Sequence, residues 1–308
     1  MAKPANIAEN ISLTSIMIHE VLMCAMCLQI AIRLIFHSGR FEWAMAYFFC
    51  ILVYGLLIRF GKANKNPVFY RIRLLWNVIA MNFAFTSIKS IVPLIGAPIS
   101  DSALANIDVF IIGQDLSILA QTVYSKPLTE IMSLGYMLFI VFLSFAFLYY
   151  GSGDIRRLTV FCVGIFSLYG IGISGYTIVP AEGPYVHFAE LYSKPIEGYL
   201  FTSLNALMVK LGSSRFDVFP SLHVGVGLYL LLFFRRWSRS LYHAYLVPFI
   251  LLTISTVYLR YHYVTDILCG APLGALCYWG SVVFAKRIGF TEDHSISREE
   301  DYDFQPAK

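Results

Sequence analysis

The sequence predicts an all-α protein that crosses a membrane several times. Of its 308 residues, 58% are hydrophobic and 14% are charged, whereas soluble domains are typically about 45 to 50% apolar. The apolar residues come in blocks long enough to span a bilayer as helix, which takes about 20 residues. The strict alternation that a transmembrane barrel requires is missing. We therefore expect a polytopic helical protein with about 6 to 8 transmembrane helices.

Eight apolar segments are candidates for these helices. They cover residues 15–36, 43–58, 74–95, 128–150, 158–180, 222–234, 245–259 and 265–284. The first is ambiguous because His19, Glu20 and Arg33 interrupt it, so an interfacial helix is an alternative. The sixth and seventh are short and need their flanks to complete a crossing.

The distribution of cations predicts the orientation. Basic residues gather in alternate connections: Arg59, Lys62, Lys65, Arg71, Arg73, Arg156, Arg157, Arg235, Arg236, Arg239, Lys286 and Arg287. By the positive-inside rule this side is cytoplasmic, and both termini lie there. The opposite connections, 97–126 and 181–220, are longer and less basic. The first of them is expected to hold a short interfacial helix, because Leu116, Leu119, Ala120 and Val123 recur at helical spacing.

Other features narrow the class of protein. All six cysteines fall inside apolar runs, which indicates buried apolar side chains rather than a disulfide framework or zinc site. No cleavable signal peptide is predicted. The net charge of +4 is too small to indicate nucleic-acid binding. The acidic residues 288–308 are expected to form a disordered cytoplasmic tail.

Two histidines stand at the starts of apolar segments. His262 and Asp266 in HYVTD are four residues apart, so on a helix the carboxylate would hold one imidazole nitrogen. An isolated pair of this kind is more often structural. However, His223 in FPSLH opens another apolar run, and counting segments places both histidines, with the PAEGPY stretch after the fifth segment, on the non-cytoplasmic face.

This combination suits phosphoryl transfer without a metal or cofactor. His262 is the expected nucleophile, Asp266 orients it, and His223 acts as general acid and base. For the phosphate oxygens we expect Ser221 and the free backbone amides of a first helical turn, with Pro220 at the first helical position. Arg260 is the first candidate for the phosphate-binding cation and Arg215 the second.

The paired motifs resemble the type 2 phosphatidic acid phosphatase (PAP2) superfamily. FPSLHVG (219–225) and HYVTD (262–266) are similar to the second and third motifs of its inositol phosphorylceramide synthase-like branch. The resemblance implies a six-helix catalytic core within residues 74–287, preceded by N-terminal membrane helices in 1–73, with the roles given above for both histidines and Asp266.

The sequence departs from the family pattern where phosphate is bound. The superfamily's first motif, a lysine followed by Arg-Pro, is absent, and Thr256 replaces the arginine usual before the third-motif histidine. PAEGPY resembles the branch's own first motif, but Tyr185 stands in place of a basic residue and is counted among the substrate-binding candidates.

The predicted function is a membrane lipid phosphatase that hydrolyses a lipid phosphate monoester or diphosphate on the non-cytoplasmic face. An alternative is a phosphotransferase that moves a phospho-headgroup to a lipid alcohol such as ceramide; a second is a transporter or scaffold in which the histidines relay protons or support packing. A metal site built from the two histidines and Asp266 is a further option. The expected partners are a lipid phosphate or phospholipid and the bilayer, with no nucleic acid. The expected location is a bacterial inner membrane with a periplasmic active site.

Overall fold

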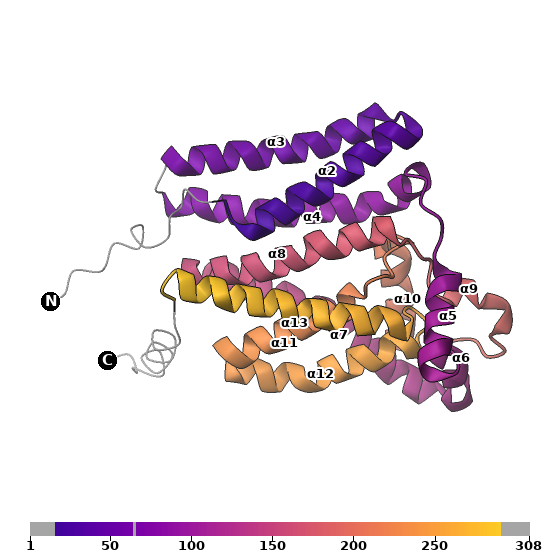
Figure 1. Ribbon diagram of the computed structural model, residues 1–308. Helices are drawn as coiled ribbons and strands as arrows, with labels where there is room; N and C mark the ends of the chain where they lie inside the picture. The colour runs from indigo at the N-terminus through magenta and orange to yellow at the C-terminus, as the bar shows by residue number, and fades with distance from the viewer. Residues whose placement is uncertain (1–15, 64–65, 291–308) are drawn as a thin grey trace, which may run out of the picture.

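The computed structural model describes residues 16–63 and 66–290, and its regular elements are helices (Figure 1). Seven of them are long and apolar enough to cross a membrane within this described part. The long helices are α2 (Ile18–Ser38), α3 (Phe41–Ala63), α4 (Pro67–Ile91), α7 (Lys126–Ser152), α8 (Ile155–Ile178), α12 (Arg239–Tyr258) and α13 (Val264–Arg287), together with the shorter α11 (Leu222–Trp237). The fold class and all eight predicted segments are thereby confirmed as helices.

The first segment forms a helix of spanning length rather than an interfacial one. Helix α2 lies along α3 and α8, and the backbone at Leu22 comes so close to Gly170 that a Cβ there would lie 3.1 Å from it. Glu20 forms a buried ion pair with Arg73, at 2.6 Å. Arg33 donates to the Thr177 carbonyl at 2.7 Å. The charges that made this segment ambiguous are therefore held by contacts to other helices.

Shorter helices cover one end of the bundle (Figure 1). They are η1 (Val92–Leu94), α5 (Asp101–Ile112), α6 (Leu116–Leu119), η2 (Ala120–Val123), α9 (Pro184–His187), η3 (Ala189–Leu191) and α10 (Leu200–Gly212). The helix expected around 116–123 is present as α6 and η2, bent by 75° from α5. Helices α5 and α10 were not predicted.

Basic residues lie at the opposite end, where α3, α11 and α13 finish and α4, α8 and α12 start. The predicted separation of a basic end from a histidine end is thus present. The cysteines are free, and Cys269, unlike the others, is exposed on the outer side of α13, so its predicted burial was wrong. The predicted acidic tail beyond residue 290 lies outside the described residues.

Glycines let α11 and α13 approach at backbone distance. A Cβ at Gly274 would lie 2.1 Å from the Gly225 carbonyl oxygen, and one at Gly270 would lie 2.2 Å from that of Ser221. Small residues at such crossings allow helices in membranes to pack closely. This contact fixes the spacing of the two helices that carry the histidine motifs.

Candidate active site

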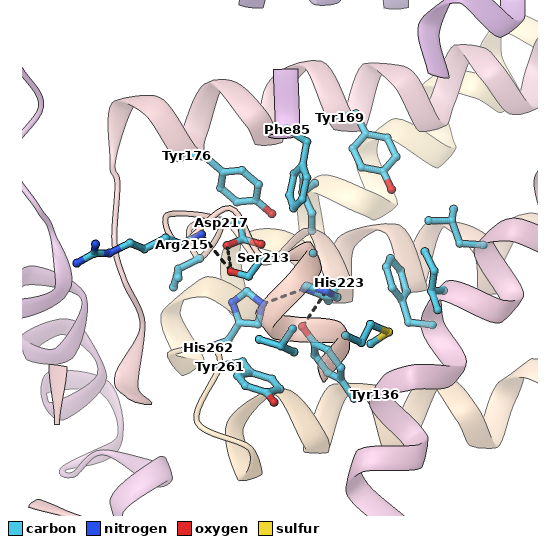
Figure 2. Close-up of a pocket in the computed structure, with 18 of the residues that line it drawn as sticks. Phe85, Tyr136, Tyr169, Tyr176, Ser213, Arg215, Asp217, His223, Tyr261 and His262 are labelled. Atoms are coloured by element: carbon cyan, nitrogen blue, oxygen red, sulfur yellow. Dashed lines mark hydrogen bonds between the residues drawn. The ribbon is translucent and has the colours of Figure 1, made fainter. Parts of the chain in front are cut away.

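His223 and His262 meet where α11 begins and the loop before α13 ends. His223 Nδ1 lies 3.2 Å from His262 Nε2, and Figure 2 shows both rings facing one cavity. The other nitrogen of His262, Nδ1, lies 3.4 Å from Asp266 Oδ2. Nε2 of His262 is therefore the nitrogen turned toward His223 and away from the carboxylate.

Asp266 is built into the start of α13. Its Oδ2 accepts a hydrogen bond from the Tyr263 backbone at 2.7 Å, and its side chain is fully buried. The Asp266 carbonyl accepts from the Ser221 backbone at 3.0 Å, which ties the start of α11 to that of α13. The carboxylate is held by a helix terminus, so its position beside His262 is fixed by the backbone.

Helix α7 holds His223 from the other side. Tyr136 Oη lies 2.9 Å from His223 Nε2, and the rings of Tyr136 and Phe139 pack against the imidazole. Each ring nitrogen of His223 thus has a different partner. The sequence pattern does not mark Tyr136, which precedes His223 by 87 positions.

Two aspartates of α5 anchor the loops around the histidines. Asp108 accepts from the backbone of Val264 and of Thr265, each at 2.7 Å, and so caps the first turn of α13. Asp101 accepts from the Gly183 backbone at 2.8 Å and from the Tyr263 hydroxyl at 2.9 Å. Both carboxylates are buried. Helix α5 therefore joins the PAEGPY stretch to the HYVTD stretch.

Arg260, the first candidate for a phosphate-binding cation, points elsewhere. Its guanidinium lies 3.7 Å from the centroid of the Tyr192 ring and donates to Tyr124 Oη at 3.1 Å and to the Lys194 carbonyl. The residue has φ +66° and its side chain is 7% exposed. The left-handed turn directs the side chain under the outer loop, away from the cavity.

Ser221 is also not placed as expected. Helix α11 begins at Leu222, so Ser221 is its N-cap and Pro220 precedes the cap. The Ser221 hydroxyl accepts from the Val224 backbone at 3.4 Å, and the residue is fully buried. Its side chain stabilises the helix start and does not line the cavity.

A cavity of about 270 Å³ adjoins the two histidines. Its outer part, called the polar mouth, contains Glu182, Tyr185, Ser213, Arg215 and Asp217. Its inner part, the apolar arm, runs between α4, α7 and α8 and is lined mainly by apolar side chains, with the polar Asn82 among them: Met81, Asn82, Phe85, Ile140, Leu143, Tyr169 and Leu222. Leu143 follows Tyr136 by seven positions on α7, which corresponds to a depth of ~10 Å along the helix. Figure 2 shows the histidines where the two parts join.

Of the predicted substrate-binding residues, Tyr185 and Arg215 line the cavity. Arg215 lies at its mouth, where Nε forms an ion pair with Glu182 and the side chain is 57% exposed. Figure 2 shows the guanidinium directed away from His262. Asp217 accepts from Ser213 Oγ at 3.0 Å and lies beside the His262 ring.

Burial lowers the pKa of His262 to about 4, although the nearby Asp217 carboxylate and a hydrogen bond with the Val218 backbone act in the opposite direction. At neutral pH this imidazole is therefore uncharged, and Nε2 or Nδ1 carries a lone pair. A neutral ring whose Nδ1 faces a carboxylate presents the lone pair on Nε2, the nitrogen that faces the cavity.

The site residues do not converge on one point as metal ligands would. His262 stands between its partners, with one nitrogen toward His223 and the other toward Asp266. Within the described residues, no group of three or more His, Cys, Asp or Glu side chains is arranged to hold a metal ion. The arrangement suits a nucleophile with an orienting carboxylate and a separate acid and base.

The fold and the site define an all-helical polytopic membrane protein with a paired-histidine site at one end of its bundle. A family model described as PAP2 superfamily matches residues 103–280, which include both histidines, and the chain belongs to this superfamily. The match begins after α4, and the predicted domain limits of 74–287 stay a prediction.

One relative is a PA-phosphatase related-family protein from Dictyostelium discoideum. It is 29% identical over 126 residues, which make up 40% of this chain and 23% of the relative. The aligned part thus spans about a quarter of the relative's length. No solved structure matches the chain.

Proposed function

We propose that this protein is a membrane lipid phosphatase that breaks a phosphoester bond of a lipid through a phosphohistidine on His262. The observation that carries the proposal is the placement of His262, with Nε2 3.2 Å from His223 and Nδ1 facing Asp266 at the edge of a cavity. An imidazole oriented by a carboxylate can act as a nucleophile. A second imidazole beside it can donate a proton to the leaving oxygen and accept one from water.

In the first half of the reaction, Nε2 of His262 attacks phosphorus and the bond from phosphorus to the lipid oxygen breaks. His223, which is protonated while the anionic phosphate lies beside it, gives its Nδ1 proton to that oxygen, so the lipid alcohol leaves uncharged. Asp266 stabilises the positive charge that develops on the His262 ring. His223 is left neutral, with its Nδ1 lone pair directed to the reaction site.

In the second half, a water molecule attacks phosphorus and gives a proton to His223 Nδ1. The bond from phosphorus to His262 Nε2 then breaks, and both histidines return to their starting states. The proton that His223 donated is thus replaced from water, and no metal or cofactor is required for the balance.

The surroundings of the site support a lipid substrate. The apolar arm enters the bundle between helices of spanning length, and Ile140 on its wall is 46% exposed on the outer surface of α7. A hydrocarbon chain in the arm would place the phosphate between the histidines. We further propose that the histidine end faces away from the cytoplasm, because the basic residues lie at the opposite end.

A phosphotransferase is the second candidate, and the apolar arm favours it. The arm reaches His223, so a lipid alcohol such as ceramide could take the place of water and give its proton to the same nitrogen. Both reactions share the phosphohistidine and differ only in the acceptor.

The test measures two products from a panel of lipids: water-soluble phosphorus released into solution, and phospho-headgroup transferred to an added lipid alcohol. Both are measured for the purified protein and for its His262→Ala variant, with and without that alcohol. The proposal expects the wild-type protein, and not the variant, to release water-soluble phosphorus without the alcohol. Turnover only when the alcohol is present would support the transferase. Equal release by both proteins would contradict a phosphohistidine, and no turnover in either would favour the transporter or scaffold.

A further inference from the structure

The charged groups of the cavity do not match a doubly charged phosphate. Three charged side chains line it in the described structure: Glu182, Asp217 and Arg215. Arg215 is the only cation among them, and Glu182 already pairs with it. The carboxylate of Asp217 accepts a hydrogen bond from the neutral Ser213 hydroxyl and lies beside His262. The charge left over at the reaction site is therefore negative.

Tyr185 lies near the same three charged side chains. Partial burial is the main cause that raises the pKa of its hydroxyl, and the carboxylates of Asp217 and Glu182 act in the same direction while Arg215 acts against them. Sites that act on phosphate monoesters hold the dianion with cations. Here Arg260, the other candidate, is packed between tyrosines outside the cavity.

The cavity also continues beyond the histidines on the side away from the apolar arm. A monoester would fill only the arm and the phosphate position. The polar mouth offers further space beside Asp217, and the rings of Tyr176 and Tyr185 also line the cavity. A carboxylate near aromatic rings is a favourable environment for an ammonium group.

We propose that the substrate is a lipid phosphodiester with one negative charge on its phosphate and an ammonium group in its headgroup, which binds Asp217 in the polar mouth. This inference rests on the proposed function and replaces the monoester or diphosphate expected from the sequence. The chain occupies the apolar arm, and the bond that breaks joins phosphorus to the lipid alcohol. His262 carries the phospho-headgroup until water releases it.

The experiment compares three lipids with identical acyl chains in mixed micelles: phosphatidylethanolamine, phosphatidylglycerol and phosphatidic acid. The measured quantity is kcat/KM for release of water-soluble phosphorus. The proteins are the wild type, Asp217→Asn, Asp217→Glu and Glu190→Gln, with His262→Ala as the blank. Glu190 is an exposed carboxylate of the same outer region that does not line the cavity, so its variant controls for net charge.

The wild type is expected to prefer phosphatidylethanolamine about tenfold or more over the other two lipids, which is the effect of one charge-assisted hydrogen bond. Asp217→Asn should lose this preference, and Asp217→Glu and Glu190→Gln should keep it. The ratio between lipids is read within each protein, so a partly unfolded variant still reports it.

Faster turnover of phosphatidic acid, equal turnover of the two diesters, or an unchanged preference in Asp217→Asn would overturn the inference. If the wild type cleaves phosphatidic acid faster than phosphatidylethanolamine and His262→Ala cleaves neither, the proposed function stands while this inference fails. If none of the lipids is cleaved, or the blank is equally active, both fail.

Discussion

Nε2 of His262 lies 3.2 Å from Nδ1 of His223, although 39 positions separate the two residues in the chain. Their meeting depends on three supports from different helices. Asp266 holds the far side of His262, Tyr136 holds the far side of His223, and glycines bring α11 against α13.

Gly274→Ala should separate α11 from α13 and reduce activity by ~10-fold or more, since a misplacement of about 1 Å can cost ~100-fold. The added Cβ would lie 2.1 Å from the Gly225 carbonyl oxygen, and backbone cannot move aside as a side chain can. Gly280→Ala is the matched control on the same helix, because nothing lies within 4 Å of its Cβ. Equal kcat/KM for the two variants would contradict this role of the crossing.

Tyr136→Phe should lower kcat ~5- to 30-fold with little change in KM, as expected from the loss of one hydrogen bond of ~1 to 2 kcal/mol that orients the acid. When the Tyr136 hydroxyl accepts from Nε2 of His223, it favours the tautomer with a free Nδ1, which the water step needs. The pH profile of kcat should therefore change as well.

Tyr54→Phe is the control for Tyr136→Phe, because its hydroxyl donates to Asn77 Oδ1 at 2.8 Å and is also buried. It lies on α3, away from the cavity. A similar loss of kcat in both variants would indicate a structural effect and not orientation of His223.

Asp108→Asn should lower both thermal stability and activity. It weakens two backbone hydrogen bonds at the start of α13, and an N-cap is typically worth ~1 kcal/mol. Asp154→Ala removes the N-cap of α8 at the opposite end of the bundle, a position where Asn would keep the cap. The temperature of thermal unfolding should therefore fall in both variants, whereas kcat/KM should fall only for Asp108→Asn. A fall of kcat/KM in both variants would contradict a specific role of Asp108 at the site.

The acid limb of kcat/KM should lie well below pH 6.5. His262 must be neutral to attack, and burial lowers its pKa from 6.5 to about 4 in the presence of the facing groups Asp217, Asp266 and His223. Because the unfolded chain takes up this proton more readily, the contribution of His262 to stability is complete above pH 6.5 and is lost as the pH falls toward 4.

Asp217→Asn should move the acid limb of kcat/KM to still lower pH, because the Asp217 carboxylate, which the variant lacks, favours the charged ring of His262. A limb at the ordinary histidine pKa in both proteins would be inconsistent with this environment for His262.

The helices and the meeting of the motifs could be predicted from the sequence, because hydrophobic blocks and alternating basic connections report directly on spans and sides. The contacts that hold the two histidines in place could not be predicted from the sequence. Asp108 is 156 positions from Val264, and Tyr136 lies inside an apolar helix where a tyrosine is unremarkable in sequence. Such contacts depend on the packing of distant segments.

The prediction for Arg260 shows a different limit. Its position two residues before His262 indicated a shared site, but a left-handed backbone turn sends its side chain to Tyr192. Ser221 was likewise expected in the first turn, whereas the helix begins one residue later. The spacing of residues in the sequence predicts where their side chains point only within regular secondary structure.

The most direct test of the account is to trap the covalent intermediate. The protein is mixed with a lipid carrying radioactive phosphorus, quenched in denaturant at alkaline pH, digested and mapped by mass spectrometry. The account predicts acid-labile label on the peptide that contains His262, less of it in Asp266→Asn and none in His262→Ala. Label on His223, or full turnover with no label on either histidine, would contradict it.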